Sequence, residues 1–197
     1  MPEKKNTKEL ILKAALMQIQ EAGYNGTSIR DIAKKVGVRE SAIYNHFKSK
    51  SEIFEEIINK LKPDSVAKKL LTDALLEKLN NPELFLKEFA FKIFTFWQSG
   101  NEQSFIKIIL IEQSRTVKEI DLSLKSYVAE YIDLIKLIFT EMIKHNFIKK
   151  EDPELLAISF FSPLFFYRIT NNNELLSRKA KKFLDNHVAF FWSSVKK

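Results

Sequence analysis

The apolar residues of this chain recur at spacings of three and four residues, which is the period of an amphipathic helix. The first such run occupies residues 7–22, where four apolar positions share one face: Ile11, Ala14, Ala15 and Ile19. Runs that alternate apolar and polar residues between hairpin turns, as strands do, find little support in the sequence. The pattern therefore predicts an all-α fold.

Three short helices are expected to follow this first segment. The sequence Ser28-Ile-Arg-Asp31 is a capping box, which satisfies the unpaired N–H groups at a helix start. Gly37 ends that second helix, because only glycine enters a positive-φ C-cap without strain. The third helix is predicted over residues 39–47, with Ile43 and Phe47 turned inward.

A second capping box, Ser49-Lys-Ser-Glu52, opens the fourth helix. Pro63 ends that helix, because proline disfavours helical geometry in the residue before it. The region 116–121 fits either a loop or a continued helix. Six further helices are expected, over residues 65–79, 83–98, 102–115, 124–145, 154–170 and 174–195.

Charge is distributed unevenly along the chain, whose formal net charge is +7. Residues 1–62 contain 12 Lys and Arg against 8 Asp and Glu, whereas residues 63–197 contain 20 against 17. Phenylalanine shows the opposite bias, because 15 of the 17 lie at or after Phe85. The sequence therefore implies a compact basic N-terminal part, which favours polyanionic partners, and an aromatic-rich remainder.

Composition also indicates the cellular compartment in which the protein works. The chain contains no cysteine, which excludes disulfides, thiolate metal sites and a cysteine nucleophile, and which suits a reducing cytoplasm. The first ten residues are charged and polar, unlike a signal peptide, and no stretch approaches the roughly 18 uninterrupted apolar residues of a membrane span. We therefore expect a cytoplasmic protein with no membrane partner.

Enzymatic chemistry finds little support in the sequence. The three histidines are scattered and lack the spacing of metal ligands, and there is no Gly-rich phosphate loop or nucleophile elbow. Glu102 and Glu112 lie in predicted helices without an obvious partner. The sequence predicts a protein that is not an enzyme and that holds no metal and no cofactor.

Two short helices joined by a tight glycine turn, the first capped and the second polar outside, are what a helix-turn-helix requires. In that motif the first helix crosses the DNA backbone, and the second enters a major groove wide enough for one α-helix. The helix predicted after Gly37 turns a polar set outward: Arg39, Glu40, Ser41, Ala42, Tyr44, Asn45 and His46, with Lys48 and Lys50 just beyond.

The run from Glu21 to Ile58, EAGYNGTSIRDIAKKVGVRESAIYNHFKSKSEIFEEII, resembles the motif of TetR-family transcriptional regulators. In that family a helix ends in Gly-Tyr, Thr-Ser opens the next helix, and a Gly-Val turn precedes Tyr-x-His-Phe-x-x-Lys. The resemblance covers residues 7–60, and the rest of the chain is similar only in length and in its succession of helices. It implies a helix-turn-helix DNA-binding domain over residues 1–50 and a helical ligand-binding and dimerisation domain over residues 51–197.

The resemblance also implies site residues. It implies phosphate contacts, which position the recognition helix, by Thr27, Tyr44, His46 and Lys50. Ser41, Ala42 and Asn45 would face base edges, where asparagine can pair with adenine and the alanine methyl can meet a thymine methyl.

Three further residues complete the predicted DNA-binding set: Ser28, Arg39 and Lys48. Arg39 stands where the family often has a serine N-cap, so a capping contribution of about 1 kcal/mol is lost, although arginine can bond a phosphate or a guanine edge. Lys48 and Lys50 also fit an ordinary solvated helix face.

The aromatic residues beyond Phe85 exceed what a minimal helical bundle needs. Besides filling the core, they can line an apolar pocket or form the centre of a dimer interface. By resemblance, the middle helices enclose a small-molecule inducer and the last two helices form a four-helix bundle between two copies. The expected ligand-binding residues are Phe94, Trp97, Ile109, Tyr131, Ile135 and Phe165. The expected dimer residues are Leu155, Ile158, Phe161, Leu164 or Phe165, Leu184, Val188, Phe191 and Trp192.

Together these features predict a transcriptional repressor that binds a pseudo-palindromic operator in double-stranded DNA as a homodimer and is released by a small, largely apolar ligand. The alternative is a helix-turn-helix protein whose helical body binds a protein partner, or that acts as an activator. Polar catalytic groups converging in the body, instead of an apolar cavity, would favour a helix-turn-helix module that merely tethers an enzyme or partner-binding body to DNA.

Overall fold

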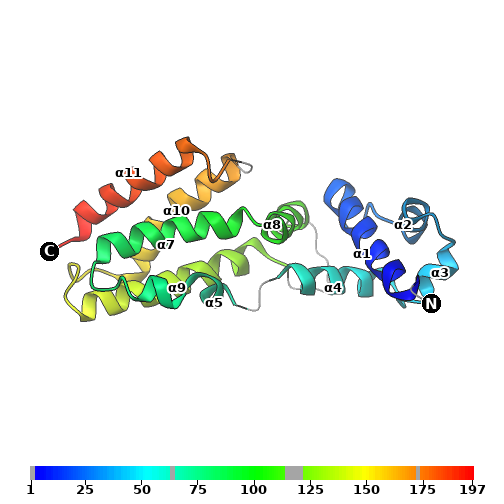
Figure 1. Cartoon of the computed structure of the whole chain (residues 1–197), viewed down its shortest axis with the longest axis horizontal. Coiled ribbons are helices and arrows are strands. Elements are labelled where there is room, and N and C mark those ends of the chain that lie inside the picture. Colours follow the sequence, from blue (N-terminus) through cyan, green and yellow to red (C-terminus); the bar gives the residue numbers. More distant parts are fainter. Residues whose placement is uncertain (1–2, 63–64, 114–121, 172–173) are drawn as a thin grey trace. The chain divides into compact units, whose positions relative to one another are not determined.

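The structure of the chain is a computed structural model that describes residues 3–62, 65–113, 122–171 and 174–197. The described residues form helices and no strand, which confirms the predicted all-α fold (Figure 1). One isolated antiparallel bridge joins Ile148 to Lys196. The helices are α1 (Glu3–Ala22), α2 (Ile29–Val36), α3 (Glu40–Tyr44), α4 (Lys50–Leu61), α5 (Val66–Leu70), α6 (Asp73–Leu76), α7 (Pro82–Trp97), α8 (Gly100–Glu112), α9 (Leu124–Lys144), α10 (Pro153–Thr170) and α11 (Arg178–Val195).

The chain folds into two compact units. The head unit comprises Met1–Pro63 and Ser104–Leu124, and the body unit comprises Asp64–Gln103 and Lys125–Lys197. Helix α8 begins in the body unit and ends in the head unit, so one continuous helix supplies residues to both. The functional boundary expected at residue 50 stays a prediction.

Polar N-caps set the starts of six helices. In each, a side-chain oxygen accepts a hydrogen bond from a backbone N–H two or three residues later, as a helix start requires. The N-cap half of both predicted capping boxes is confirmed, because Ser28 accepts from the Asp31 N–H and Ser49 accepts from the Glu52 N–H. The capped starts are those at Ser28, Ser49, Ser65, Asn81, Asp152 and Ser177.

The single helix expected over residues 65–79 is wrong. The structure has two short helices there, α5 and α6, separated at Leu71 and Thr72. The buried residues explain the break, because Leu70 and Leu75 are five positions apart and a continuous helix would not turn both to one face. Helix α11 also starts later than expected, at Arg178, where Ser177 is the cap. The region 116–121 lies outside the described residues.

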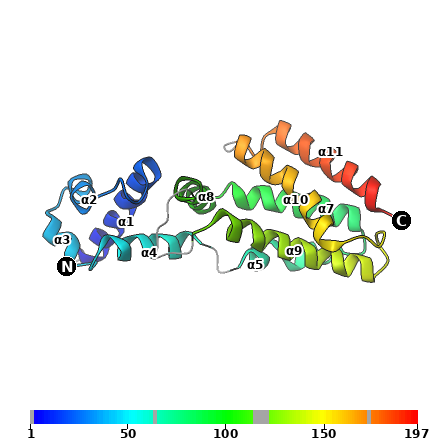
Figure 2. The same cartoon turned by 180° about the vertical axis from the view of Figure 1, so that it is seen from behind.

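The body unit is built around aromatic side chains from its long helices. Figure 2 shows α7, α9, α10 and α11 from behind, and the ring contacts join them in pairs. Phe94 on α7 stacks on Phe183 of α11 at 6.4 Å between centroids, and Phe139 on α9 meets Phe160 of α10 edge-on at 5.8 Å. Many of the aromatics predicted in excess are therefore core residues.

No helix within the described ranges has both the length and the apolar character that crossing a membrane requires.

The half-buried His187 of the body unit makes stability depend on pH. His187 donates its Nε2–H to the Phe160 carbonyl at 2.9 Å and stacks on Phe183, and burial lowers the pKa of the ring from its ordinary 6.5. As pH falls below about 6.5, the unfolded chain takes up the proton first, so this contribution to stability is present above that pH and is lost below it.

We expect the free energy of unfolding, measured by urea titration between pH 7.5 and 5, to fall less steeply in His187→Gln than in the wild type. The control is His145→Gln, which changes an exposed histidine 3.7 Å from Glu141. A wild-type pH profile retained in His187→Gln would contradict the assignment.

Candidate nucleic-acid interface and a buried polar cluster

The head unit holds its short helices on a small apolar core. Helix α1 packs against α2 and α4, and the core side chains from these helices are fully buried: Ile11, Ala15, Ile32, Ile53 and Phe54. Helix α3 packs against α2 and contributes Ile43, while Phe47 just beyond it is also buried. This is the three-helix arrangement expected of a helix-turn-helix.

The turn between α2 and α3 depends on Gly37. Its φ of 80° is left-handed, and its N–H bonds the carbonyls of Ala33 and Lys34 at 2.9 and 3.3 Å. The N–H of Val38 also bonds the Ala33 carbonyl, at 3.0 Å. These bonds complete the end of α2 as predicted, because glycine adopts this conformation without a Cβ clash.

Helix α3 is shorter than the predicted range 39–47. It has five residues, and Arg39 occupies its N-cap position without a side-chain capping bond, as the missing serine led us to expect. The outer face of α3 and its flanks is polar: Tyr44 is 55% exposed, and Asn45 is exposed beside it. The interior placement of Tyr44 and Asn45 that would have excluded a recognition helix is therefore not found.

The ten predicted DNA-binding residues differ in exposure. Ala42, His46 and Lys50 are half-buried, and Thr27 is buried. The exposed ones, which offer their side chains directly to a partner, are Ser28, Arg39, Ser41, Tyr44, Asn45 and Lys48.

Lys50 holds the turn that precedes α2. Its Nζ donates to the carbonyl of Tyr24 at 2.8 Å and to that of Thr27 at 2.9 Å, and it lies 4.2 Å from the centre of the Tyr24 ring. A charged donor on two carbonyls and one ring ties the start of α4 to the segment before α2. Sequence reasoning missed this role, because the acceptors are backbone carbonyls.

Two further bonds fix the same turn. The Thr27 hydroxyl donates to the Gly23 carbonyl at 2.9 Å, so a phosphate contact through this hydroxyl would require that bond to break. Glu112, near the end of α8, accepts the Tyr24 N–H at 2.7 Å and is buried. The glutamate that had no visible partner in the sequence therefore bonds a backbone group 88 residues away.

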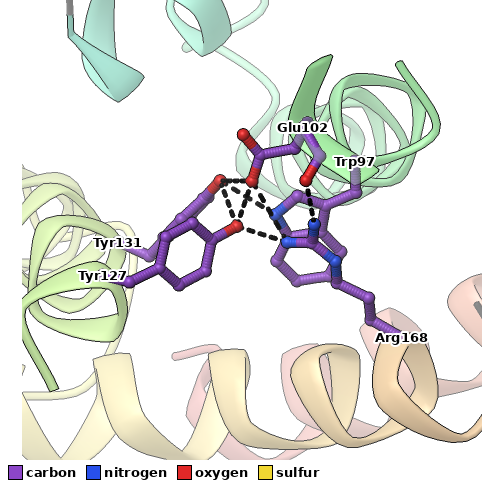
Figure 3. Close-up of polar contacts among 5 residues, drawn as sticks. All are labelled: Trp97, Glu102, Tyr127, Tyr131 and Arg168. Atoms are coloured by element: carbon purple, nitrogen blue, oxygen red, sulfur yellow. Dashed lines mark hydrogen bonds and ion pairs between the residues drawn. The ribbon is translucent and has the colours of Figure 1, made fainter. Parts of the chain in front are cut away.

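The second glutamate without an obvious partner, Glu102, lies in a polar cluster inside the body unit (Figure 3). Arg168 Nη1 donates to Glu102 Oε1 at 3.2 Å, and the side chains of this pair are both 1% exposed. Tyr127 accepts from Arg168 and donates to Glu102, while Tyr131 lies 3.3 Å from Glu102 Oε1 and accepts from Trp97 Nε1 at 2.9 Å. The cluster is these five residues: Trp97, Glu102, Tyr127, Tyr131 and Arg168.

Burial governs the electrostatics of this cluster. It raises the pKa of the Glu102 carboxyl, against the opposing effects of the Arg168 charge and the tyrosine hydrogen bonds. It also raises the pKa of both tyrosines, which therefore stay neutral donors. The Arg168 guanidinium carbon lies 4.7 Å from the Trp97 ring centre and 5.6 Å from that of Tyr127, so the positive charge is held by π faces as well as by the carboxylate.

The predicted ligand-binding residues fall in both units. Phe94, Trp97, Tyr131 and Phe165 lie together in the body unit, with Trp97 within 6.1 Å, centre to centre, of the other three rings. Ile135 is buried on α9 of the same unit, whereas Ile109 belongs to the head unit. The predicted set includes Trp97 and Tyr131 and lacks the ion pair of Glu102 and Arg168 beside them.

The described residues contain no group of three or more histidines and acids arranged to hold a metal ion.

Comparison with known proteins gives consistent results. Residues 11–57 match the family model described as bacterial regulatory proteins, tetR family. The chain is 46% identical over 55 residues to the HTH-type transcriptional regulator AcrR of Shigella flexneri. The matched stretch is 28% of this chain and 26% of that protein. The chain is also 39% identical over 51 residues to IcaR, a negative transcriptional regulator of a biofilm operon in Staphylococcus aureus. That stretch is 26% of this chain and 27% of IcaR.

The matches to these curated relatives span about a quarter of their length. The fold is shared over a much longer stretch, because the solved structure of AibR, in complex with isovaleryl coenzyme A and operator DNA, superposes with a TM-score of 0.63 over 93% of this chain and 97% of that one, at 19% identity.

Replacing Lys50 by methionine should destabilise the head unit. The two carbonyls would lose a charged donor, so we expect the free energy of unfolding to fall by about 1–3 kcal/mol in urea titrations. The control is Lys48→Met, at an exposed position, which should change stability by less than about 0.5 kcal/mol. Equal effects of the two substitutions would show that Lys50 does not hold the turn.

Proposed function

Because this chain belongs to the TetR family of bacterial regulatory proteins through its N-terminal domain, we propose that it is a DNA-binding transcriptional repressor. Its relative IcaR is described as a negative regulator, which supports repression over activation. A regulator of this kind works on the bacterial chromosome, so we place it in the cytoplasm. We assign no catalytic role and no cofactor to it.

The observation that carries the proposal is the polar outer face of α3, presented on a buried core. Tyr44 and His46 would contact phosphates, and Ser41, Ala42 and Asn45 would face base edges. Arg39, Lys48 and Ser28 would extend the phosphate contacts on either side. Thr27 and Lys50 would serve the same surface by fixing the turn before α2, and a phosphate contact of Lys50 has to use the third N–H of its ammonium group.

We propose that two copies associate through α10 and α11. Large apolar side chains on one face of α10 are exposed in the single chain, and Phe190 on α11 is 75% exposed. Such a surface suits the apolar centre of a dimer interface. The α10 residues concerned are Leu155, Ile158, Phe166 and Ile169.

The interface residues expected from sequence are only partly available for this role. Phe161, Leu164, Leu184, Val188 and Phe191 are buried within the chain, because the body core uses them. A dimer of this kind would place two recognition helices about 34 Å apart, in successive major grooves of a pseudo-palindromic operator.

We also propose that a small, largely apolar ligand bound in the body unit releases the DNA. AibR, which shares this fold, has been crystallised in complex with isovaleryl coenzyme A and operator DNA, which supports the binding of a ligand and of DNA by one protein of this fold. Helix α8 supplies residues to both units, so a change at its first turn has a covalent route to Glu112 and the turn before α2. The coupling between ligand and DNA would be about 1–3 kcal/mol. A body that binds a protein partner instead would leave DNA affinity unchanged by every small molecule.

Binding to the DNA that flanks the gene of this protein should depend on Asn45. In mobility-shift titrations, Asn45→Ala should weaken operator binding by about 1–3 kcal/mol while leaving binding to random duplexes unchanged, because a base contact is lost. Lys48→Ala should instead weaken both and shallow the salt dependence by about one contact per subunit. The control is Lys179→Ala, an exposed lysine on α11. A complex indifferent to salt, or a wild-type protein that binds no duplex, would overturn the proposal.

The dimer should depend on the exposed face of α10. Phe166→Asp places a charge in the proposed interface, so we expect the molar mass measured by light scattering to fall to that of one chain at micromolar concentration. Leu137→Asp is the matched control, because Leu137 is 58% exposed on α9 and lies outside the proposed interface. Dimers in both variants would locate the interface elsewhere.

A further inference from the structure

The buried polar cluster of the body unit contains an acceptor that the described residues do not use. All three donors that reach the Glu102 side chain, from Arg168, Tyr127 and Tyr131, converge on Oε1. Glu102 Oε2 is buried and receives no hydrogen bond from the described part of the chain. Figure 3 shows this oxygen directed away from Arg168. A buried acceptor left unpaired costs about 1–3 kcal/mol, so such an atom calls for an explanation.

The rings of this cluster contact further aromatic side chains of the body unit. The Tyr131 ring stacks on Phe161 at 5.2 Å, and Phe165 lies 6.3 Å from Tyr127 and 6.1 Å from Trp97, centre to centre. Of these rings only Phe165 is half-buried, and the others are buried. Aromatic rings beside a few buried polar groups are the composition of a small-molecule site, in which the polar groups fix the orientation of the ligand.

We propose that this cluster is the polar end of the ligand site of the body unit, and that it takes a neutral aromatic compound whose hydroxyl or N–H group donates to Glu102 Oε2. The proposal rests on the proposed function, since it gives a chemical class to the ligand of that regulator. The aromatic part of the ligand would pack against the rings around Trp97 and Phe165.

Charge balance favours a neutral ligand. The Glu102 carboxylate already pairs with the Arg168 guanidinium, so a cationic ligand would bring an uncompensated positive charge into a buried site. An anionic ligand would face the carboxylate itself. A neutral donor satisfies the acceptor without adding charge. It also stabilises the ionised carboxylate, whose pKa burial raises.

Four naphthalene derivatives of similar shape test the ligand class. Their dissociation constants from the full-length protein would be measured at pH 7.5 by calorimetry: 2-naphthol as the neutral donor, 2-methoxynaphthalene as its acceptor-only analogue, 2-naphthylmethylammonium as the cation and 2-naphthoate as the anion. We expect 2-naphthol to bind at least about tenfold more tightly than each of the others, because only it pairs the buried acceptor without a charge.

The Glu102→Gln variant tests the location. Its amide can keep the carbonyl toward Arg168 and place the NH₂ group where Oε2 stood, which turns an acceptor into a donor. The preference for 2-naphthol should then be lost, because its hydroxyl oxygen and the ether oxygen of 2-methoxynaphthalene can both accept from that NH₂ group. Glu141→Gln, at an exposed glutamate on α9, should keep the wild-type preference. If Glu102→Gln does not fold, judged by its thermal unfolding, the wild-type comparison of 2-naphthol with 2-methoxynaphthalene still decides the ligand class.

Three outcomes would overturn this inference. Equal affinity for 2-naphthol and its methyl ether would show that Oε2 does not select the ligand, and an unchanged preference in a folded Glu102→Gln variant would place the site elsewhere. No binding of any compound would leave an ordered water as the partner of Oε2. The assay contains no DNA, so these failures are distinct from a failure of the proposed function, which the mobility shift detects.

Discussion

The presentation of α3 depends on the burial of two side chains, Ile43 and Phe47. A helix of five residues has no stability of its own in water, because nucleation costs more than one turn of hydrogen bonds returns. It exists here because those side chains fill the core that α1, α2 and α4 build. The polar outer face accompanies this burial, since Tyr44 and Asn45, which lie between the two buried side chains, are exposed.

Charged side chains with little or partial exposure find different partners in the two units. In the head unit the Lys50 ammonium group and the Glu112 carboxylate both bond backbone groups of the turn at Tyr24–Thr27, so their role is to fix the chain path before α2. In the body unit Glu102 pairs with Arg168, 66 residues away, among aromatic rings. An ion pair so deeply buried adds little net stability over an apolar replacement, because desolvation offsets its attraction. What the pair does provide is a polar group among aromatic rings, at the site proposed above for a ligand.

What could be predicted from the sequence is what depends on neighbouring residues. The helix starts at Ser28 and Ser49 and the turn at Gly37 are local, because each is decided within four residues, and all three are confirmed. The partners of Glu102 and Lys50 could not be predicted. Arg168, the partner of Glu102, lies 66 residues further along the chain, and Lys50 bonds backbone carbonyls, which every residue has. The break between α5 and α6 also escaped, because it depends on where Leu70 and Leu75 meet the body core.

The head unit and the body unit differ in the same way, because one surface is local in sequence and the other is not. The surface around α3 is formed by residues that are neighbours in the sequence. It could therefore be predicted from the sequence alone. The Glu102 cluster draws its members from α7, α8, α9 and α10, so its chemistry exists only once these four helices pack. A surface encoded in one short segment can stay the same while the residues that converge in the body change. The match over residues 11–57 therefore bears on the DNA surface proposed for the head unit and not on what the body unit binds.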